Sequence, residues 1–398
     1  MSINKRRIAA ALLLMAGFAF AQESVRPEIG RPLQAAQELM KAGKFKDALG
    51  KVLEADAVPN RTAYESFILD RMRGSAAARA GDEATAVKSF AAALASGRLQ
   101  SAEQLPMIEA LAAAAYQSKD YAKAIEWADR YLRQGGSSAQ VRSLRTSAHY
   151  LSGDYAGVVK DMQQQVDSVE KSVPVVDENT LRMLAASYAK LGDDAGYTLA
   201  LEKLLVHHPK KDYWADRLAR LQNRPGFAER LALDAYRLQM ATDTLDDPAQ
   251  YLEMAQLALQ ADLPAEAKRV VEAGYAAGKL GTGPEAGRHK RLRDLAYKQA
   301  AEDEKTLNAE VIGRSAEALV NFGQAFVMTG RVDKGIELLE QGIAKGGLKR
   351  GEDAKLHLAQ AYLLSGNKAK AIEMFRSVRG GDGVADLARL WAIRAGRS

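Results

Sequence analysis

Metal binding and general acid–base catalysis both require histidine or carboxylate side chains that converge on one point. His207 and His208 are adjacent in the sequence, and neighbours on a helix point about 100° apart, so their rings do not converge on a shared metal ion. Pro209 follows directly, which places the pair at the end of a helix, where cationic side chains complement the helix dipole. We therefore predict no metal site from the histidines, which are His149, His207, His208, His289 and His357.

The sequence also lacks the motifs that mark a catalytic site. It has no cysteine, which excludes a disulfide framework, a thiolate zinc site and a thiol nucleophile. No spacing pairs two acidic residues as general acid and base, and no motif groups a nucleophile with a base and an orienting residue. The glycine-rich stretch 380–383 lacks the preceding strand and the following Lys-Ser or Lys-Thr pair of a phosphate-binding loop. We predict no cofactor and no catalytic residue, with an enzyme in a helical scaffold kept as an alternative.

A basic run from Arg288 to Arg293 could attract an anionic surface. Acidic residues follow closely, at Asp294 and from Glu302 to Glu304, so the run is typical of a solvated helix face. Docking to an acidic partner or to anionic lipid is the alternative. The formal charge of the whole chain is only +6, which is too small to indicate a nucleic-acid partner, and we expect none.

The first 21 residues have the three parts of a secretory signal peptide. A basic segment at residues 5–7 precedes an apolar stretch at residues 8–21, and residues 19–21 (Ala-Phe-Ala) give the small-x-small pattern that signal peptidase recognises, just before Gln22. The apolar stretch is shorter than the roughly 20 residues that span a bilayer. We expect a cleaved signal peptide, export to the periplasm and no integral membrane span after cleavage. An uncleaved N-terminal anchor is the alternative.

Helix-period segments alternate with short turns along the rest of the chain, and no convincing strand pattern interrupts them. Many turns pair a glycine with an acidic or amide residue, as in Gly81-Asp82 and Gly153-Asp154. Glycine can end one helix in the left-handed conformation, and Asp or Asn can cap the next one. The pattern predicts an all-α protein built from paired helices.

A small residue recurs a few positions after most of these turns. Ala48, Ala86 and Ala124 follow one another at separations of 38 residues, and Gly335 and Ala371 are 36 residues apart. Self-similarity at such a period indicates a repeat protein. A small side chain lets two helices cross closely, whereas a larger one would push their backbones apart. The recurring small residues are Ala48, Ala86, Ala124, Ala267, Gly335 and Ala371.

This period and these positions resemble the tetratricopeptide repeat, a unit of about 34 residues that folds into two antiparallel helices. The unit around Trp214 departs from the pattern, because it runs through Arg224-Pro225-Gly226 instead of the usual turn. The family's small position in the first helix matches Ala36, Gly74, Ala112, Ala185, Ala255, Gly323 and Ala359, and its bulky position in the second helix matches Val52, Phe90, Leu201, Val271, Leu339 and Phe375.

The resemblance implies an all-α, right-handed superhelical solenoid of antiparallel helix pairs, of the tetratricopeptide type, with a C-terminal capping helix. We expect a signal peptide at residues 1–21 and a flexible lead-in at 22–32. An N-terminal repeat array is expected at 33–245 and a C-terminal array at 246–396. The capping helix should cover the apolar face of the last repeat from about residue 384 to 394.

In tetratricopeptide proteins the first helices of successive repeats line an inner groove that accepts extended peptides or helices. The resemblance therefore implies a partner-binding groove in this chain, with a protein or peptide as the partner. Arg, Tyr and Gln side chains suit a polypeptide, because they offer carboxylate pairing, stacking and amide hydrogen bonds. Ordinary solvated side chains are the alternative at each position. The candidate groove residues are Arg71, Arg79, Glu109, Tyr116, Tyr150, Arg182, Lys190, Gln256, Gln324 and Gln360.

The stretch from Ala316 to Ile393 resembles tetratricopeptide proteins that accompany TonB-type energy-transducing complexes of Gram-negative bacteria. It joins two adjacent repeats through the linker at residues 346–349 and ends in the expected capping helix. The resemblance implies a periplasmic scaffold or adaptor for an envelope complex, with a TonB-type system as one candidate. An adaptor for polysaccharide export or outer-membrane assembly is the alternative.

We predict that the exported protein begins at Gln22, because the small-x-small pattern ends at Ala21. N-terminal sequencing of protein purified from the periplasmic fraction measures this directly. As a control, Ala21→Arg should block cleavage and leave the precursor in the membrane fraction. An intact Met1 on membrane-bound wild-type protein would contradict the prediction.

Overall fold

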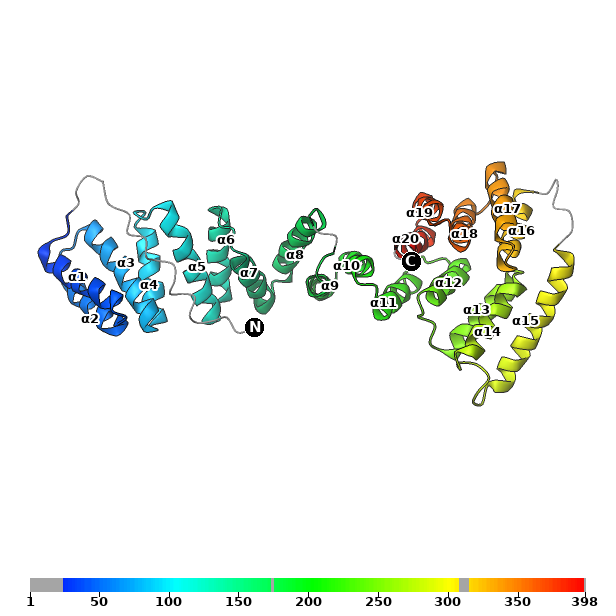
Figure 1. Cartoon of the computed structure of the whole chain (residues 1–398), viewed down its shortest axis with the longest axis horizontal. Coiled ribbons are helices and arrows are strands. Elements are labelled where there is room, and N and C mark those ends of the chain that lie inside the picture. Colours follow the sequence, from blue (N-terminus) through cyan, green and yellow to red (C-terminus); the bar gives the residue numbers. More distant parts are fainter. Residues whose placement is uncertain (1–23, 173–174, 308–314, 397–398) are drawn as a thin grey trace. The chain divides into compact units, whose positions relative to one another are not determined.

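The computed structural model describes residues 24–172, 175–307 and 315–396, which form helices joined by turns, with no strand among them (Figure 1). The expected signal peptide lies outside the described residues. The chain divides into two compact units. Unit 1 contains the residues up to 171 together with 187–192, and unit 2 contains 172–186 and the residues from 193 onward. The division falls within α9 (Glu178–Leu191).

Unit 1 consists of helices that pack in consecutive pairs, α1 with α2, α3 with α4, α5 with α6 and α7 with α8, and each pair also packs against the next. This pairing confirms the predicted all-α fold. The helices are α1 (Pro27–Lys41), α2 (Phe45–Asp56), α3 (Ala63–Ala80), α4 (Glu83–Ala95), α5 (Ser101–Gln117), α6 (Tyr121–Arg133), α7 (Ala139–Ser152) and α8 (Tyr155–Glu170).

Unit 2 is also built from helices that pack against the next one in the chain, from α10 to α15 and from α16 to α20. Within the described ranges, no helix of either unit combines the length and the apolar character needed to cross a bilayer. The helices are α10 (Asp194–His207), α11 (Lys211–Gln222), the 3-10 turn Glu229–Leu231 that leads into α12 (Ala232–Ala241), α13 (Pro248–Gln260), α14 (Pro264–Ala276), α15 (Ala286–Thr306), α16 (Ala316–Met328), α17 (Val332–Lys345), α18 (Gly351–Leu364), α19 (Lys368–Ser377) and α20 (Val384–Ala395).

The turns between paired helices use the chemistry that the sequence predicts. Gly81 ends α3 in the left-handed conformation with φ of 83°, and Gly153 ends α7 with φ of 79°. Asp82 then caps α4, because its carboxylate accepts a hydrogen bond of 3.1 Å from the backbone N–H of Thr85. Asp154 caps α8 in the same way. Each turn therefore stops one helix and starts the next within two residues.

The recurring small residues lie buried between paired helices, as predicted, and Ala48 and Ala124 have no exposed surface. Between α16 and α17 the approach is closer still. A Cβ atom added at Gly335 would lie 2.4 Å from Cγ2 of Val327 and 2.7 Å from the carbonyl oxygen of Gly323. Because no side chain fits there, glycine at this position is what allows the two helices to touch.

The predicted flexible lead-in is wrong for residues 27–32, because α1 begins at Pro27. Proline suits the first helical position, where a backbone N–H would have no intrahelical partner. Ile29 of this first turn is fully buried. Just before the helix, the backbone N–H and the Nε of Arg26 donate to Oε1 of Glu65 in α3, at 3.0 and 2.9 Å. Burial and this pair hold the segment against α3.

The last helix, α20, packs on α18 and α19, as expected for a capping helix. Trp391 of α20 stacks on Phe375 of α19, with ring centroids 6.0 Å apart and an angle of 9° between the planes. Helix α20 also packs against α10 and α12, so the end of the chain returns to the first helices of unit 2 (Figure 1). The array boundary expected at residue 245 therefore lies inside unit 2.

Ion pairs link the returning C-terminal helices to the first helices of unit 2. The buried carboxylate of Glu202 in α10 accepts from Arg217 of α11 at 2.9 Å and from Arg389 of α20 at 2.8 Å. Arg230, in the turn before α12, binds Asp353 of α18 at 2.8 Å. These pairs join residues far apart in the sequence and close unit 2 on itself.

We predict that Ala124→Leu lowers the free energy of unfolding by about 1–3 kcal/mol, because a larger side chain at the fully buried contact of α6 overpacks it. Denaturant melts of the variant and the wild type measure the change. Ala122→Leu is the matched control, since Ala122 is exposed on the same helix, and it should leave the midpoint within error. Equal effects of the two substitutions would contradict the crossing assigned to Ala124.

Candidate binding site

Two predicted groove residues of unit 1 contact the neighbouring repeat. Arg71 of α3 forms an ion pair of 3.2 Å with Glu103 of α5. Glu109 of α5 accepts a hydrogen bond of 3.0 Å from the hydroxyl of Ser138, the residue that caps α7. These side chains join successive helix pairs, so a partner would have to compete with contacts inside the protein.

The aromatic groove candidates of unit 1 pack in a repeated way. Tyr116 at the end of α5 meets Tyr121 at the start of α6, with ring centroids 5.8 Å apart. Tyr150 at the end of α7 meets Tyr155 at the start of α8 at the same separation. Arg79 lies over an aromatic ring of α2, 5.3 Å from its centroid. The tyrosines thus pack across the turn of their own helix pair, whereas Arg79 packs on the preceding pair.

The remaining candidates divide into exposed residues and residues of a cavity. Arg182 and Lys190 of α9 and Gln256 of α13 are exposed. Gln324 of α16 and Gln360 of α18 both line a cavity in unit 2. Of the ten predicted groove residues, the structure brings these two together at one concave site.

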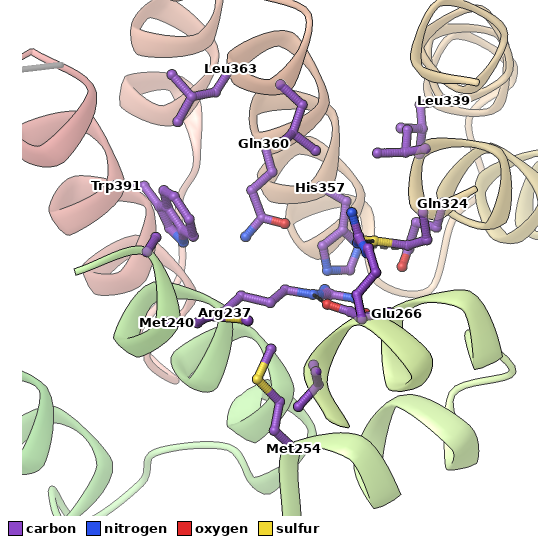
Figure 2. A pocket seen from close by; sticks show the side chains of 16 residues that line it. Arg237, Met240, Met254, Glu266, Gln324, Leu339, His357, Gln360, Leu363 and Trp391 are labelled. Carbon is purple, nitrogen blue, oxygen red and sulfur yellow. Dashed lines mark hydrogen bonds and ion pairs between the residues drawn. The ribbon is translucent and has the colours of Figure 1, made fainter. Parts of the chain in front are cut away.

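The cavity has a volume of about 300 Å³ and is bounded by α12, α13 and α14 on one side and by α16, α17, α18 and α20 on the other (Figure 2). It is the candidate ligand site of unit 2, because ligand sites are usually mostly apolar concavities with a few placed polar groups. The apolar side chains that line it include Met240, Met254, Val327, Met328, Leu339 and Leu363.

A buried network of charged and polar side chains adjoins the cavity. Arg237 of α12 donates to both carboxylate oxygens of Glu266 in α14, at 2.8 and 2.6 Å, and to Asp234 at 2.7 Å. The Nε2 of His357 in α18 lies 3.0 Å from Oδ1 of Asp234, and its Nδ1 lies 2.6 Å from the amide nitrogen of Gln324. The network therefore connects α12, α14, α16 and α18 through one chain of contacts, of which Figure 2 draws Arg237, Glu266, His357 and Gln324.

The environment of Asp234 shifts its pKa strongly. Burial alone would raise the pKa of this carboxyl, but the attraction of His357 and of Arg237 outweighs burial and brings the pKa below its usual range. Burial would likewise lower the pKa of the Arg237 guanidinium, but Glu266 and Asp234 raise it. Both groups are therefore held in their charged forms, as buried charges must be when they are fully paired.

Sequence reasoning missed Asp234, Arg237 and Glu266. The signal that could have found them is their position inside an almost entirely buried helix, because every residue of α12 from Leu233 to Gln239 is buried. Asp234 and Arg237 are three residues apart, the spacing at which opposite charges meet on a helix. A charged pair within such an apolar helix indicates a buried network with further partners.

The basic run on α15 forms ion pairs with acidic residues close by in the sequence, such as the 2.6 Å pair of Lys290 with Asp294. His289, from the same run, is buried and accepts a hydrogen bond of 3.1 Å from the backbone N–H of Gly281. Within the described ranges of the chain, no cluster of histidine and acidic side chains could hold a metal ion.

Comparison with known proteins identifies the class of the C-terminal part. Residues 320–385 match the model of the tetratricopeptide repeat family, which confirms the predicted resemblance for the segment that runs from α16 to the start of α20. Helix pairs along the chain and this match define a helical scaffold of the tetratricopeptide type. No curated protein matches the sequence.

Solved structures of two bacterial repeat proteins are similar to this chain. One is a tetratricopeptide repeat protein from Parabacteroides merdae, with 13% identity, a TM-score of 0.30 and coverage of 84% of this chain and 99% of that one. The other is the C-terminal part of a TPR repeat-containing protein from Cytophaga hutchinsonii, with 12% identity, a TM-score of 0.27 and coverage of 81% and 98%.

We predict that Asp234→Asn lowers the free energy of unfolding by about 3 kcal/mol, because it removes the buried charge that His357 and Arg237 share. Equilibrium unfolding at neutral pH measures the loss. Asp294→Asn on the exposed face of α15 is the matched control, and it should change stability far less.

The difference in stability between wild type and Asp234→Asn should depend on pH. Because the pKa of Asp234 is lower in the folded than in the unfolded protein, its stabilisation is complete above the pKa of an unfolded aspartate, about 4, and is lost as the pH falls below that value. The gap between wild type and Asp234→Asn should therefore shrink between about pH 5 and pH 3. A gap that stays constant over this range would contradict the role assigned to the charge.

Proposed function

We propose that this protein is an exported scaffold that holds a polypeptide segment of a cell-envelope complex at the cavity of unit 2. The observation that carries the proposal is the cavity itself. Gln324 and Gln360, two residues that the tetratricopeptide register marks as groove-facing, line it together. The family-matched residues 320–385 supply every lining residue of one side except Trp391.

The composition of the cavity supports a polypeptide as the occupant. Three methionines and three leucines are among the residues that line it, and flexible methionines adapt to different apolar side chains. Leu364, which is 56% exposed, and the exposed Arg269 both line the cavity, so it is open to a partner. A few polar groups within an apolar surface are typical of the anchor positions of protein interfaces.

The charged groups next to the cavity favour binding over catalysis. A catalytic acid or base needs a free lone pair or proton directed at the reacting atom. Arg237 is instead bound by both Glu266 and Asp234, and His357 lies between Asp234 and Gln324. These side chains hold helices together, so the enzyme alternative gains no support from them.

The proposed location and the proposed partner are argued from the sequence. The basic segment, the apolar stretch and the small-x-small pattern of residues 5–21 support export to the periplasm. The resemblance of residues 316–393 supports a TonB-type energy-transducing complex as the first system to examine. Polysaccharide export and outer-membrane assembly are the second candidates, and the partners found by crosslinking separate the two.

We test the proposal by photo-crosslinking in living cells. A photoreactive amino acid at Leu364, which lines the cavity, should give a covalent adduct with a polypeptide of the cell envelope. Leu199 of α10 is the matched control, because it is 60% exposed in the same unit and does not line the cavity. Mass spectrometry of the adducts identifies the partner.

We expect the variant with the photoreactive amino acid at position 364 to give adducts with an envelope protein, and the control variant at position 199 to give none. Retention of the protein in the cytoplasm would contradict the proposed location. Identical adducts from both positions, or none from Leu364, would contradict the cavity as the binding site.

A further inference from the structure

Two buried hydrogen-bond donors at the cavity have no acceptor among the residues that the structure describes. They are Nε2 of Gln360, a residue only 8% exposed, and Nε1 of Trp391, which is 7% exposed. Both residues line the cavity, and Figure 2 shows their side chains directed into it from α18 and α20. Buried polar groups almost always have a partner, and each exception needs an explanation. A ligand oxygen at this point would explain both.

The position of these donors is fixed by the fold. The indole of Trp391 stacks on Phe375 at an angle of 9° between the planes, so its N–H direction is set by the packing of α20 on α19. Gln360 lies on α18, in the stretch from Leu358 to Tyr362 where every residue is buried. The cavity therefore presents two preorganised donors, which lowers the entropic cost of binding an acceptor.

The other walls specify an apolar group beside that acceptor. Met240, Met254 and Leu339 line the cavity together with other aliphatic side chains. A volume of about 300 Å³ is at the lower end of the roughly 300–1,000 Å³ found for small-molecule pockets. It therefore suits one large side chain with its adjoining main chain better than a whole drug-sized molecule.

The charges around the cavity favour a neutral acceptor. The cation of Arg237 is already bound by two carboxylates, Glu266 and Asp234. Arg269, the other cation of the lining, contacts the sulfur of Met328. His357 also lies against Asp234, so the buried charges pair with one another, and both unpartnered donors are neutral. A main-chain carbonyl, which carries no net charge to desolvate, suits two neutral donors better than a carboxylate.

We propose that the cavity takes one large apolar side chain of a polypeptide partner, and that a main-chain carbonyl beside that side chain accepts hydrogen bonds from Gln360 Nε2 and Trp391 Nε1. The proposal rests on the protein-binding function above and names the chemistry that its site recognises. Leucine, methionine and phenylalanine are the side chains of suitable size and character. The two donors select for the backbone position, and the apolar wall selects for the side chain.

The test uses the whole mature protein and pentapeptides blocked at both ends, with leucine or alanine between two pairs of glycines. The chain has three tryptophans, so three indole N–H resonances appear in a ¹⁵N spectrum, and Trp391→Phe assigns one of them. The leucine peptide should move the Trp391 indole proton downfield in a saturable way, because this proton gains an acceptor. The alanine peptide should bind at least about tenfold more weakly, because it buries less apolar surface.

Substitutions then separate the two donors from general packing. Gln360→Leu keeps the size of the side chain, and Trp391→Phe keeps an aromatic ring to stack on Phe375. Each should weaken the leucine peptide about three- to tenfold, the effect of one neutral hydrogen bond. Gln260→Leu is the matched control, because Gln260 is exposed and does not line the cavity, and it should leave the affinity unchanged.

Several results would overturn the proposal. One is a Trp391 indole resonance that does not shift when the leucine peptide is added, and another is an indole proton that already donates to the Gln360 amide oxygen in the free protein. The others are tighter binding of N-acetyl-leucine, whose carboxylate is free, than of the leucine peptide, and a copurified small molecule that blocks binding of the peptide. If crosslinks from Leu364 to an envelope protein persist alongside one of these results, only the assigned chemistry fails. If those crosslinks are missing as well, the proposed function fails with it.

Discussion

The structure of unit 2 depends on one carboxylate, that of Glu202, which two arginines share. Arg217 lies close by in the sequence, but Arg389 comes from the last helix, 187 residues away. A buried carboxylate is costly unless it is fully paired, so Glu202 requires α20 to remain against α10. Helix α20 therefore packs at both the beginning and the end of unit 2, because it also covers the final repeat through the stack of Trp391 on Phe375.

This closure creates the cavity. Helix α20 places Trp391 on a wall that α18 shares, and α12 supplies Arg237 and Asp234 below it. The 3.0 Å contact of Asp234 with His357 joins α12 to α18 across 123 residues. An open helical array would expose these groups to water, whereas the closed unit desolvates them. The buried charges therefore hold the helices that bound the cavity, and the apolar wall and the two unpartnered donors are left for a partner.

The sequence predicts the repeats well because their determinants are local. A glycine with a capping aspartate marks turns such as Gly153-Asp154, and a small residue such as Ala124 marks a close contact between helices. The binding site is harder to predict from the sequence, because it depends on the packing of α20 against the first helices of unit 2. The family register selects Gln324 and Gln360 as groove residues, and both line the cavity. It selects Arg71 and Glu109 equally, and these two bind side chains of neighbouring helix pairs. His357, the partner of Asp234 in α12, lies 123 residues further along the chain, where no local pattern reaches.

Hydrogen exchange of α20 in a Glu202→Gln variant tests the central claim, that this carboxylate closes unit 2. The substitution keeps the shape of the side chain and removes the charge that Arg217 and Arg389 share. Closure through Glu202 predicts that the amides of α20 and α12 exchange at least about tenfold faster, while those of α16 and α17, which cross at Gly323 and Gly335, keep their rates. Unchanged exchange in α20, or equal acceleration in every helix, would contradict the account.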